Sequence, residues 1–455
     1  MGANFVNIDR NTPMLLPVDL REWIPNEDMV NFVIESIEGM ELKGLKINHR
    51  GSGSKQYPPK MMLSLLIYCY SNGIFGSRRI ERATYRDIAV RYLTGDTHPD
   101  HDTIASFRRE NFEVLSECFI KVLELAKEMK ILKIGTLSTD GTKIRANASK
   151  NKNVTYARAE ELIKQLEEEV RERIMRAEEE DKNDTDNGHQ LPEELARRET
   201  LRKKLEEARA KIEERARKRA EREREEYEKK VKSRESRTGK HKGKKIKEPN
   251  ARPCESEQIN LTDPDSRIMK KSKRDSYEQR YNAQAVVDAE GSQLIVGTRI
   301  TQCASDRNEL ESNIREIPDK IGLPEFVVGD NGYANGEEIR KIEEKGIEVY
   351  VSVGKEADYQ RNKYDFCPEK RKKKASYPFR KPWVTKMKQK METEQGKKIY
   401  SLRKRSVEPV FGVIKNVMGF RQFLLRGLDK VTAEWKLVSI AYNMKRLYNI
   451  KMAAI

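Results

Sequence analysis

The chain has 455 residues, and its 91 Lys and Arg against 74 Asp and Glu give a formal charge of +17. The longest apolar stretch, residues 61–70, is shorter than the roughly 20 residues that a membrane span needs, and the first residues lack the apolar core of a signal peptide. Five cysteines without a CxxC pair argue against a disulfide frame or a Cys-rich zinc site and fit a reducing cytoplasm. Positive charge of this size favours a polyanionic partner, most often nucleic acid.

Residues 1–130 are predicted to form an all-helical N-terminal domain, since dense apolar residues, as at 61–67, recur at helical spacings. The segment 94–99 reads Thr-Gly-Asp-Thr-His-Pro, a strong helix breaker, and Asp102 after it is predicted to cap a short helix. That helix could lie in a DNA groove, whereas an ordinary bundle with a solvated basic face is the alternative. The residues that would contact DNA are Ser106, Arg108 and Arg109.

The histidines give no catalytic pattern. His98 and His101 lie beside Asp100 and Asp102 and could imitate a metal site, but a loop that leads into a helix is the simpler interpretation. A mechanism based on histidine is therefore not expected.

Two separate parts of the chain, residues 131–153 and 276–455, are predicted to form one α/β domain. Strand-like alternation leads up to Asp140 in the first part, and the second part opens with two strand patterns across a short Gly turn, which predicts a β-hairpin. Further strands and helices then alternate before two C-terminal helices. The predicted strands are 281–288, 294–300, 325–330 and 347–353, and the predicted helices are 307–316, 336–345, 400–417 and 430–449. With the strand before Asp140, the prediction is a mixed five-stranded sheet.

The residues between these two parts are predicted to form an insertion. Residues 154–231 carry apolar side chains at four-residue steps among Glu and Arg, and a turn at 183–188 divides them, which indicates a helical hairpin or a short coiled coil. Residues 232–275 are predicted to be a basic flexible arm. Lys229 to Lys247 includes ten Lys or Arg and one Glu, too little apolar surface to fold alone.

Three acids form the candidate chemical site. If the strand before Asp140 and the strand ending at Asp330 lie side by side, as a right-handed crossover permits, both carboxylates emerge at one edge of the sheet. Glu408 shares a helix face with Gly412, which would leave space for a substrate backbone, although Pro409 fits only if the helix begins near Ser406. Taken alone, each acid can be interpreted as purely structural, either as a turn former or as a solvated side chain. Together, their carboxylates could bind paired Mg²⁺ ions that stabilise both reacting oxygens of a phosphodiester.

Three sequence blocks carry a family resemblance. Asp140-Gly141-Thr142-Lys143, Asp330-Asn331-Gly332-Tyr333 and Val407-Glu408-Pro409-Val410-Phe411-Gly412 with Lys415 resemble the signature blocks of bacterial insertion-sequence transposases of the DDE type. The segment 419–428, followed by Glu434-Trp435, resembles the insertion sequence 1182 family, and residues 58–111 are similar to the N-terminal domain of that group. The resemblance covers most of the chain apart from residues 154–275.

The resemblance implies an RNase H-like fold with Asp140, Asp330 and Glu408 as the catalytic, metal-binding triad. It also implies that Tyr400, Arg403 and Lys415 contact DNA near the scissile phosphate. The commonest form of the signature has its Arg four residues before the Glu, where this chain has Lys404 between Arg403 and Arg405. Which of these three acts remains open.

The implied function is a DDE transposase that binds terminal inverted repeats, cleaves DNA with two Mg²⁺ ions (Mn²⁺ as a substitute) and transfers the released 3′-hydroxyl to target DNA. Its expected partners are double-stranded DNA and a second copy of the chain, in the bacterial cytoplasm or nucleoid. The alternatives are an RNase H-like nuclease without strand transfer and a non-catalytic DNA-binding coiled-coil protein. Glu434 and Asp288 are acids outside the triad, and their substitution is expected to leave cleavage nearly unchanged.

Overall fold

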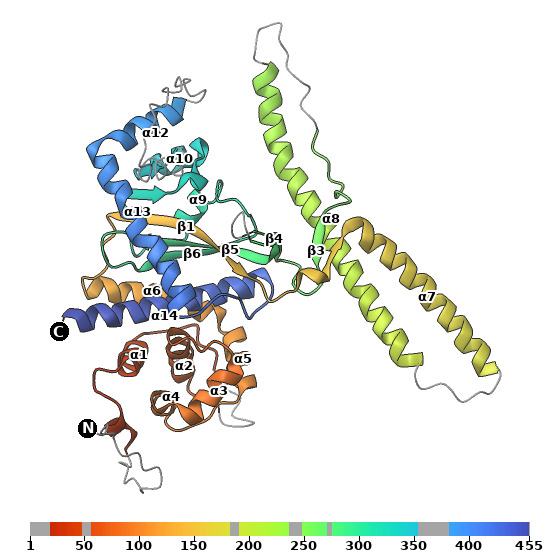
Figure 1. Cartoon of the computed structure of the whole chain (residues 1–455), viewed down its shortest axis with the longest axis horizontal. Coiled ribbons are helices and arrows are strands. Elements are labelled where there is room, and N and C mark those ends of the chain that lie inside the picture. The colour runs from red at the N-terminus through yellow and green to blue at the C-terminus, as the bar shows by residue number, and fades with distance from the viewer. Residues whose placement is uncertain are drawn as a thin grey trace, which may run out of the picture.

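The computed structural model describes residues 19–47, 56–182, 191–235, 248–270, 275–353 and 382–454. Figure 1 shows a body in which N-terminal helices lie on one side of a long C-terminal helix and a sheet lies on the other. A pair of long helices projects from this body. None of the described helices is both long enough and apolar enough to cross a membrane.

The N-terminal region is helical, as predicted. After a 3-10 turn (η1, Leu20–Trp23), its helices are α1 (Met29–Glu38), α2 (Pro59–Ser71), α3 (Ser77–Arg86), α4 (Ile88–Leu93), α5 (His101–Glu110) and α6 (Phe112–Glu128). The predicted cap of α5 is wrong by two residues. Asp100 caps the helix, because its carboxylate accepts a hydrogen bond from the backbone N–H of Thr103 at 2.7 Å, which places Asp102 inside the first turn.

The central sheet is mixed. Its strands are β1 (Thr136–Arg145), β4 (Arg267–Met269), β5 (Glu278–Asp288), β6 (Ile295–Thr301), β7 (Phe326–Gly329) and β8 (Glu348–Val351). The path runs β4-β5-β1-β7-β8, and β6 pairs with β5 as well. β5 is antiparallel to β1 and β6, whereas β7 is parallel to both β1 and β8. The five predicted strands are present, the short β4 is a sixth that was not predicted, and the arrangement is consistent with an RNase H-like fold.

Helices cover the sheet. They are α9 (Leu310–Arg315), α10 (Gly336–Glu343), α12 (Pro382–Glu392), α13 (Glu394–Gly412) and α14 (Leu428–Ala454). α13 continues into a π-helical turn (η4, Val413–Val417), and a 3-10 turn (η3, Asn331–Tyr333) follows β7. α14 packs against α2 and α6 and also against β6. Its apolar residues are therefore buried all round, from Val431 to Leu447. The N-terminal helices and the sheet thus share one apolar core.

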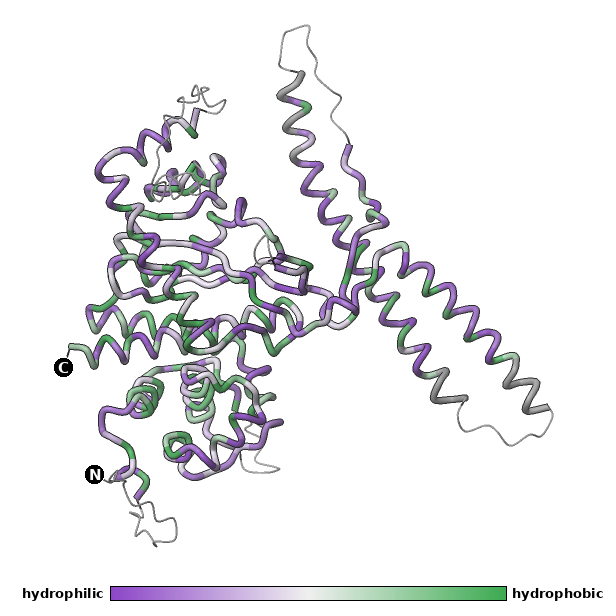
Figure 2. The backbone as a smooth tube through the Cα atoms, in the orientation of Figure 1, coloured by the Kyte–Doolittle hydropathy of each residue, from purple (hydrophilic) through white to green (hydrophobic). Residues whose placement is uncertain are grey.

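The insertion consists of α7 (Tyr156–Lys182) and α8 (Leu191–Glu235), which pack antiparallel on each other as predicted. A 3-10 turn (η2, Lys150–Lys152) leads into β2 (Asn153–Thr155), which pairs with β3 (Gln258–Asn260) at the base of the helices. Figure 2 shows the projecting helices as mostly hydrophilic along their length.

The predicted arm, residues 232–275, is only partly as expected. Its first residues belong to α8, which ends at Glu235, and residues further along form β3 and β4. These two strands pair with residues before and after the insertion, so that part of the range is folded. Residues 236–247, the most basic stretch of the prediction, lie outside the described residues.

Candidate active site and nucleic-acid interface

Asp140 and Asp330 lie side by side because β1 and β7 are parallel neighbours. Ser138 pairs with Val328, and each acid stands two residues further along the chain, Asp140 inside β1 and Asp330 directly after the end of β7. The backbone N–H of Gly332 donates to Oδ1 of Asp330 at 2.7 Å, so this carboxylate caps the 3-10 turn that follows β7. The adjacency that was conditional in the sequence is therefore present in the fold.

The electrostatic surroundings of Asp140 disfavour its charge. Burial raises the pKa of its carboxyl to about 7, the nearby negative charge of Asp330 adds to this effect, and Asp306 contributes in the same direction. The backbone N–H of Gly141 and the guanidinium of Arg403 oppose it. The net effect still disfavours two ionised carboxylates at this place, and a divalent cation between them would stabilise both charges.

Asp306 is a neighbour of this pair that the sequence analysis missed. Its Oδ1 accepts hydrogen bonds from the side-chain amides of Asn282 and Gln284, both at 2.7 Å. A Cβ at Gly141 would lie 2.2 Å from Nε2 of Gln284 and 2.6 Å from Oδ1 of Asp306, so a larger residue after Asp140 would displace these two side chains. Asp306 stands in a loop between β6 and α9 without any motif around it, so no local signal could have identified it.

Glu408 and Arg403 form an ion pair of 3.2 Å on α13, in which the Glu408 side chain is 52% exposed and that of Arg403 only 5%. Among the three neighbouring basic residues, Arg403 is the buried one and the one that acts on Asp140, whereas Lys404 and Arg405 face solvent. The ring of Tyr400 lies 6.0 Å from the Arg403 guanidinium carbon.

The three acids do not form a preassembled metal cluster. Within the described ranges, no group of three His, Cys, Asp or Glu residues is placed to hold one ion. Asp140 and Asp330 are adjacent, but Glu408 is engaged with Arg403 and is half exposed. Two of the predicted ligands are therefore brought together, and the third lies on the helix beside them.

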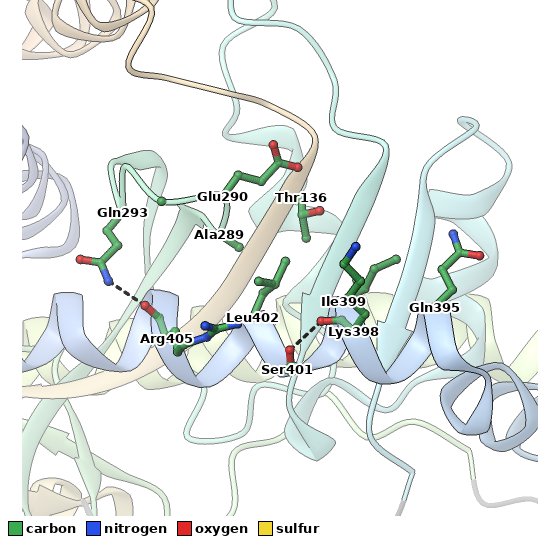
Figure 3. Close-up of a pocket in the computed structure, with 11 residues that line it drawn as sticks. Thr136, Ala289, Glu290, Gln293, Gln395, Lys398, Ile399, Ser401, Leu402 and Arg405 are labelled. Atoms are coloured by element: carbon green, nitrogen blue, oxygen red, sulfur yellow. Dashed lines mark hydrogen bonds between the residues drawn. The ribbon is translucent and has the colours of Figure 1, made fainter.

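Pro409 lies inside α13, and the prediction that its helix begins near Tyr400 or Ser406 is wrong, because α13 begins at Glu394. A proline leaves the carbonyl four residues earlier without its helical donor. Here that carbonyl belongs to Arg405, and Nε2 of Gln293 donates to it at 2.6 Å, as the dashed line in Figure 3 shows. The turn between β5 and β6 thus replaces the missing hydrogen bond. A cavity of about 690 Å³ lies between that turn and α13. Figure 3 shows Lys398 and Arg405 among the residues that line it.

A basic groove of about 470 Å³ lies beside the end of α13. Its cationic lining residues are Lys143, Arg145, Arg280, Lys415 and Arg421. The ammonium group of Lys415 donates to the hydroxyl of Thr142 on β1, two residues after Asp140. The space expected at Gly412 is present, since a Cβ there would meet nothing within 4 Å. Asp275 and Glu278 also line this groove, so its charge is positive on balance but not uniformly so.

In the N-terminal region, the structure contradicts one predicted DNA contact. Arg108 is buried, and its Nη1 donates to the hydroxyl of Tyr70 at 2.8 Å and to the carbonyl of Phe75 at 3.2 Å. Its guanidinium therefore holds helices together instead of facing DNA. Arg109 is exposed and donates to Oγ of Ser106 at 2.9 Å, so both of these remain candidates.

Comparisons with known proteins agree with this architecture. Residues 254–444 match the family model of the transposase DDE domain, and residues 18–110 match a second model, a transposase domain (DUF772). No curated protein and no solved structure matches the chain. The DDE match begins after the inserted helices, so β1 with Asp140 lies before it. Two separate parts of the chain thus match transposase domain models, and these matches support an insertion-sequence DDE transposase.

Proposed function

We propose that the chain binds the terminal inverted repeats of its own element, cleaves DNA in a metal-dependent reaction and joins the released 3′-hydroxyl to target DNA. The domain matches support the transposase role in general. The observation that carries the specific chemistry is the adjacency of Asp140 and Asp330 on parallel strands, with the pKa of Asp140 raised to about 7. Such a site is suited to a cation more than to any neutral ligand.

Asp140, Asp330 and Glu408 would hold the ions, which we propose to be two Mg²⁺ with Mn²⁺ as a substitute. Carboxylate oxygens are the donors that these hard cations prefer, so the residues present fit the ions. Glu408 would leave Arg403 to join them, and its half-exposed side chain is free to rotate. Bound ions would activate the attacking oxygen and stabilise the leaving one.

The protein's own groups would position the DNA. Arg403, released from Glu408, would lie next to the scissile phosphate, with Tyr400 beside it. The basic groove that contains Lys415 would carry the strand away from the acids, because phosphates pair with its cations. Further phosphate contacts are proposed for Lys404, Arg405, Ser106 and Arg109. Catalysis then comes from positioning and charge stabilisation, without a covalent intermediate.

The decisive experiment compares Asp140→Asn, Asp330→Asn and Glu408→Gln in a gel assay with labelled end DNA and Mg²⁺, beside a mobility-shift assay. Each variant should lose cleavage and keep nearly full binding, because one negative charge is removed while the basic surfaces remain. Normal cleavage by one variant would remove that residue from the site, and normal cleavage by all three would end the DDE assignment.

The control must be an exposed acid. Glu434 and Asp288, expected to be neutral controls, are both buried: Glu434 accepts from the N–H groups of Leu424 and Leu425, and Asp288 accepts from Glu290 and Ser292. Their substitution would disturb folding as well as charge. Glu128→Gln, at the exposed end of α6, is the matched control and should cleave normally.

A strand-transfer assay with the end DNA already nicked separates a transposase from a nuclease that cuts without joining. Joined products with plasmid target are expected.

We further propose a homodimer that holds two DNA ends, acting in the bacterial cytoplasm or nucleoid. Analytical ultracentrifugation of the complex should then give two chains for two DNA ends.

A further inference from the structure

Helix α3 has a face of arginines that the sequence analysis did not single out. Ile80, Ala83 and Thr84 are buried against the other N-terminal helices. The opposite side is exposed, and its arginines are Arg78, Arg79, Arg82 and Arg86. The helix thus buries a narrow apolar stripe and presents a wide cationic surface.

No acid in the described part of the chain pairs with these arginines. Among the described residues, none of the four arginines forms an ion pair, in contrast to Arg91, which pairs with Asp96 at 2.8 Å. The one acid of the helix, Glu81, accepts a hydrogen bond from Nδ1 of His101 at 2.9 Å. Like charges at four-residue spacing, as at Arg78, Arg82 and Arg86, destabilise a helix by about 0.2–0.5 kcal/mol per pair, and an anion bound to this face would relieve that repulsion.

An aromatic side chain lies among these charges. Tyr85 is 57% exposed, and its ring stacks on His98 with 3.8 Å between the ring centres. A large ring held rigidly at the surface beside arginines is suited to contacts with sugars and thymine methyl groups. An ordinary solvated basic face does not require such a ring.

The rest of the N-terminal region holds α3 in place. Nδ1 of His98 lies 3.1 Å from the hydroxyl of Thr84, and His101, the first residue of α5, contacts Glu81, so both histidines support this helix. Arg108 binds the carbonyl of Phe75, just before α3 begins. The predicted DNA-contacting arginine of α5 therefore positions the helix that carries the exposed ones.

We propose that α3 is the helix that reads the ends of the element in the DNA major groove, with Arg78, Arg79, Arg82 and Tyr85 against the bases and Arg86 against the backbone. This rests on the proposed binding of terminal repeats. The helix has ten residues, about 15 Å of length, and the major groove of about 12 Å admits one helix.

The test uses the full chain without divalent metal, so that binding is measured apart from cleavage. The probes are duplexes from the two flanks of the gene and an unrelated duplex of equal length. Arg78→Ala/Arg82→Ala should lose preference for the flank DNA by at least about tenfold, since each bidentate arginine–base pair contributes roughly that much discrimination. Arg78→Lys/Arg82→Lys should keep the salt dependence, because the charge remains, and still lose the preference, because lysine lacks the planar fork.

The control removes the same charge from another exposed helix. Arg340→Ala/Lys341→Ala on α10 should keep the preference intact. If the α3 variants keep the preference for the flank DNA, the proposal is wrong. It is also wrong if their affinity falls equally for the flank and the unrelated duplexes, because that result indicates contacts with the DNA backbone alone. This inference and the catalytic proposal can fail separately. If the α3 variants lose the preference but still cleave DNA with Mg²⁺, α3 acts in recognition and not in catalysis. If the unaltered chain binds the flank DNA specifically but never cleaves it, the catalytic proposal fails and this inference stands.

Discussion

The helices before β1 and the inserted helices α7 and α8 relate to the sheet in opposite ways. α2 and α6 pack on α14, which itself packs on β6, so the N-terminal helices continue the main apolar core. None of the described residues of 154–259 belongs to that core, and the inserted pair has small apolar clusters of its own, around Leu205 and Ile212. Whether a helical region is part of a domain is therefore decided by the continuity of its buried surface, not by its helicity.

A buried polar network strengthens the first connection. The hydroxyl of Tyr70 accepts from Arg108 at 2.8 Å and donates to Oε1 of Glu434 at 3.4 Å. Burial raises the pKa of Glu434, whereas the N–H groups of Leu425 and Leu424 and the charge of Arg108 oppose that rise. α2, α5, α14 and the loop before α14 meet at this network. The inserted pair instead has exposed ion pairs such as Arg198–Glu169 and Arg202–Glu206, which contribute little each.

The largest effect on stability is expected when this network is broken. Arg108→Ala should lower the free energy of unfolding by roughly 2–4 kcal/mol, because Glu434 and Tyr70 would stay buried without their cationic partner. Urea unfolding followed by circular dichroism measures the change. Arg109→Ala, one residue further on the exposed side of α5, is the matched control and should shift stability by less than about 0.5 kcal/mol. Equal effects of both substitutions would mean that the network does not join the two regions.

The second expected effect is a dependence of the free energy of unfolding on pH. It comes from the sheet and not from the insertion. In the metal-free protein the pKa of Asp140 is raised from its ordinary 3.8 to about 7, so the folded state binds this proton more tightly than the unfolded state between those values. Stability from this group is complete below pH 4 and is lost as the pH rises towards 7. Asp330→Asn removes the neighbouring charge and should therefore stabilise the metal-free protein more at pH 8 than at pH 5.

Urea titrations at the two pH values, with a chelator present, measure this difference. A gain for Asp330→Asn that is the same at both pH values would show that the two carboxylates do not interact. Because Mg²⁺ requires the ionised carboxylates, its affinity should rise with pH through about 7, which calorimetric titration can follow.

A smaller effect is expected when the insertion is removed. Asn153 and Asn260 are paired across β2 and β3, so a linker of about four Gly and Ser residues can join them in place of residues 154–259. The shortened chain should unfold cooperatively and lose no more than about 1 kcal/mol, because the deleted residues lie outside the main core. A broad, non-cooperative transition would show instead that α7 and α8 support the sheet.

The smallest effect on stability, none at all, is expected from deletion of residues 236–247. These basic residues lie outside the described part of the chain, and the prediction concerns their charge alone. Each phosphate that they neutralise should add about 0.9 to the magnitude of the negative slope of log affinity against log salt concentration, so the deletion should flatten that slope. An unchanged slope would indicate that the segment does not contact DNA.

Much of the fold could be predicted because its signals are local. The general rule for crossovers permitted, without requiring, that the strands of Asp140 and Asp330 lie side by side, and the apolar steps of residues 154–231 indicated a helical pair. Pro409 shows where such reasoning fails. Local rules place a proline in a first turn, but here a glutamine from the β5–β6 turn satisfies the carbonyl that the proline leaves open. Gln293 and Arg405 are more than a hundred residues apart, so no local sequence pattern contains both.

The sequence by itself determined most of the helical and strand segments, the two candidate acids in or directly after a strand and the excess of positive charge, because periodicity and composition are properties of neighbouring residues. Only the tertiary structure decided that Arg108 is buried while the arginines of α3 are exposed, that Asp306 lies next to Asp140, and that Arg403 is the basic residue facing the acids. The physical reason is that burial and electrostatic coupling depend on distance in space. Arg108 and Glu434 meet through Tyr70 only after α2, α5 and α14 have packed together.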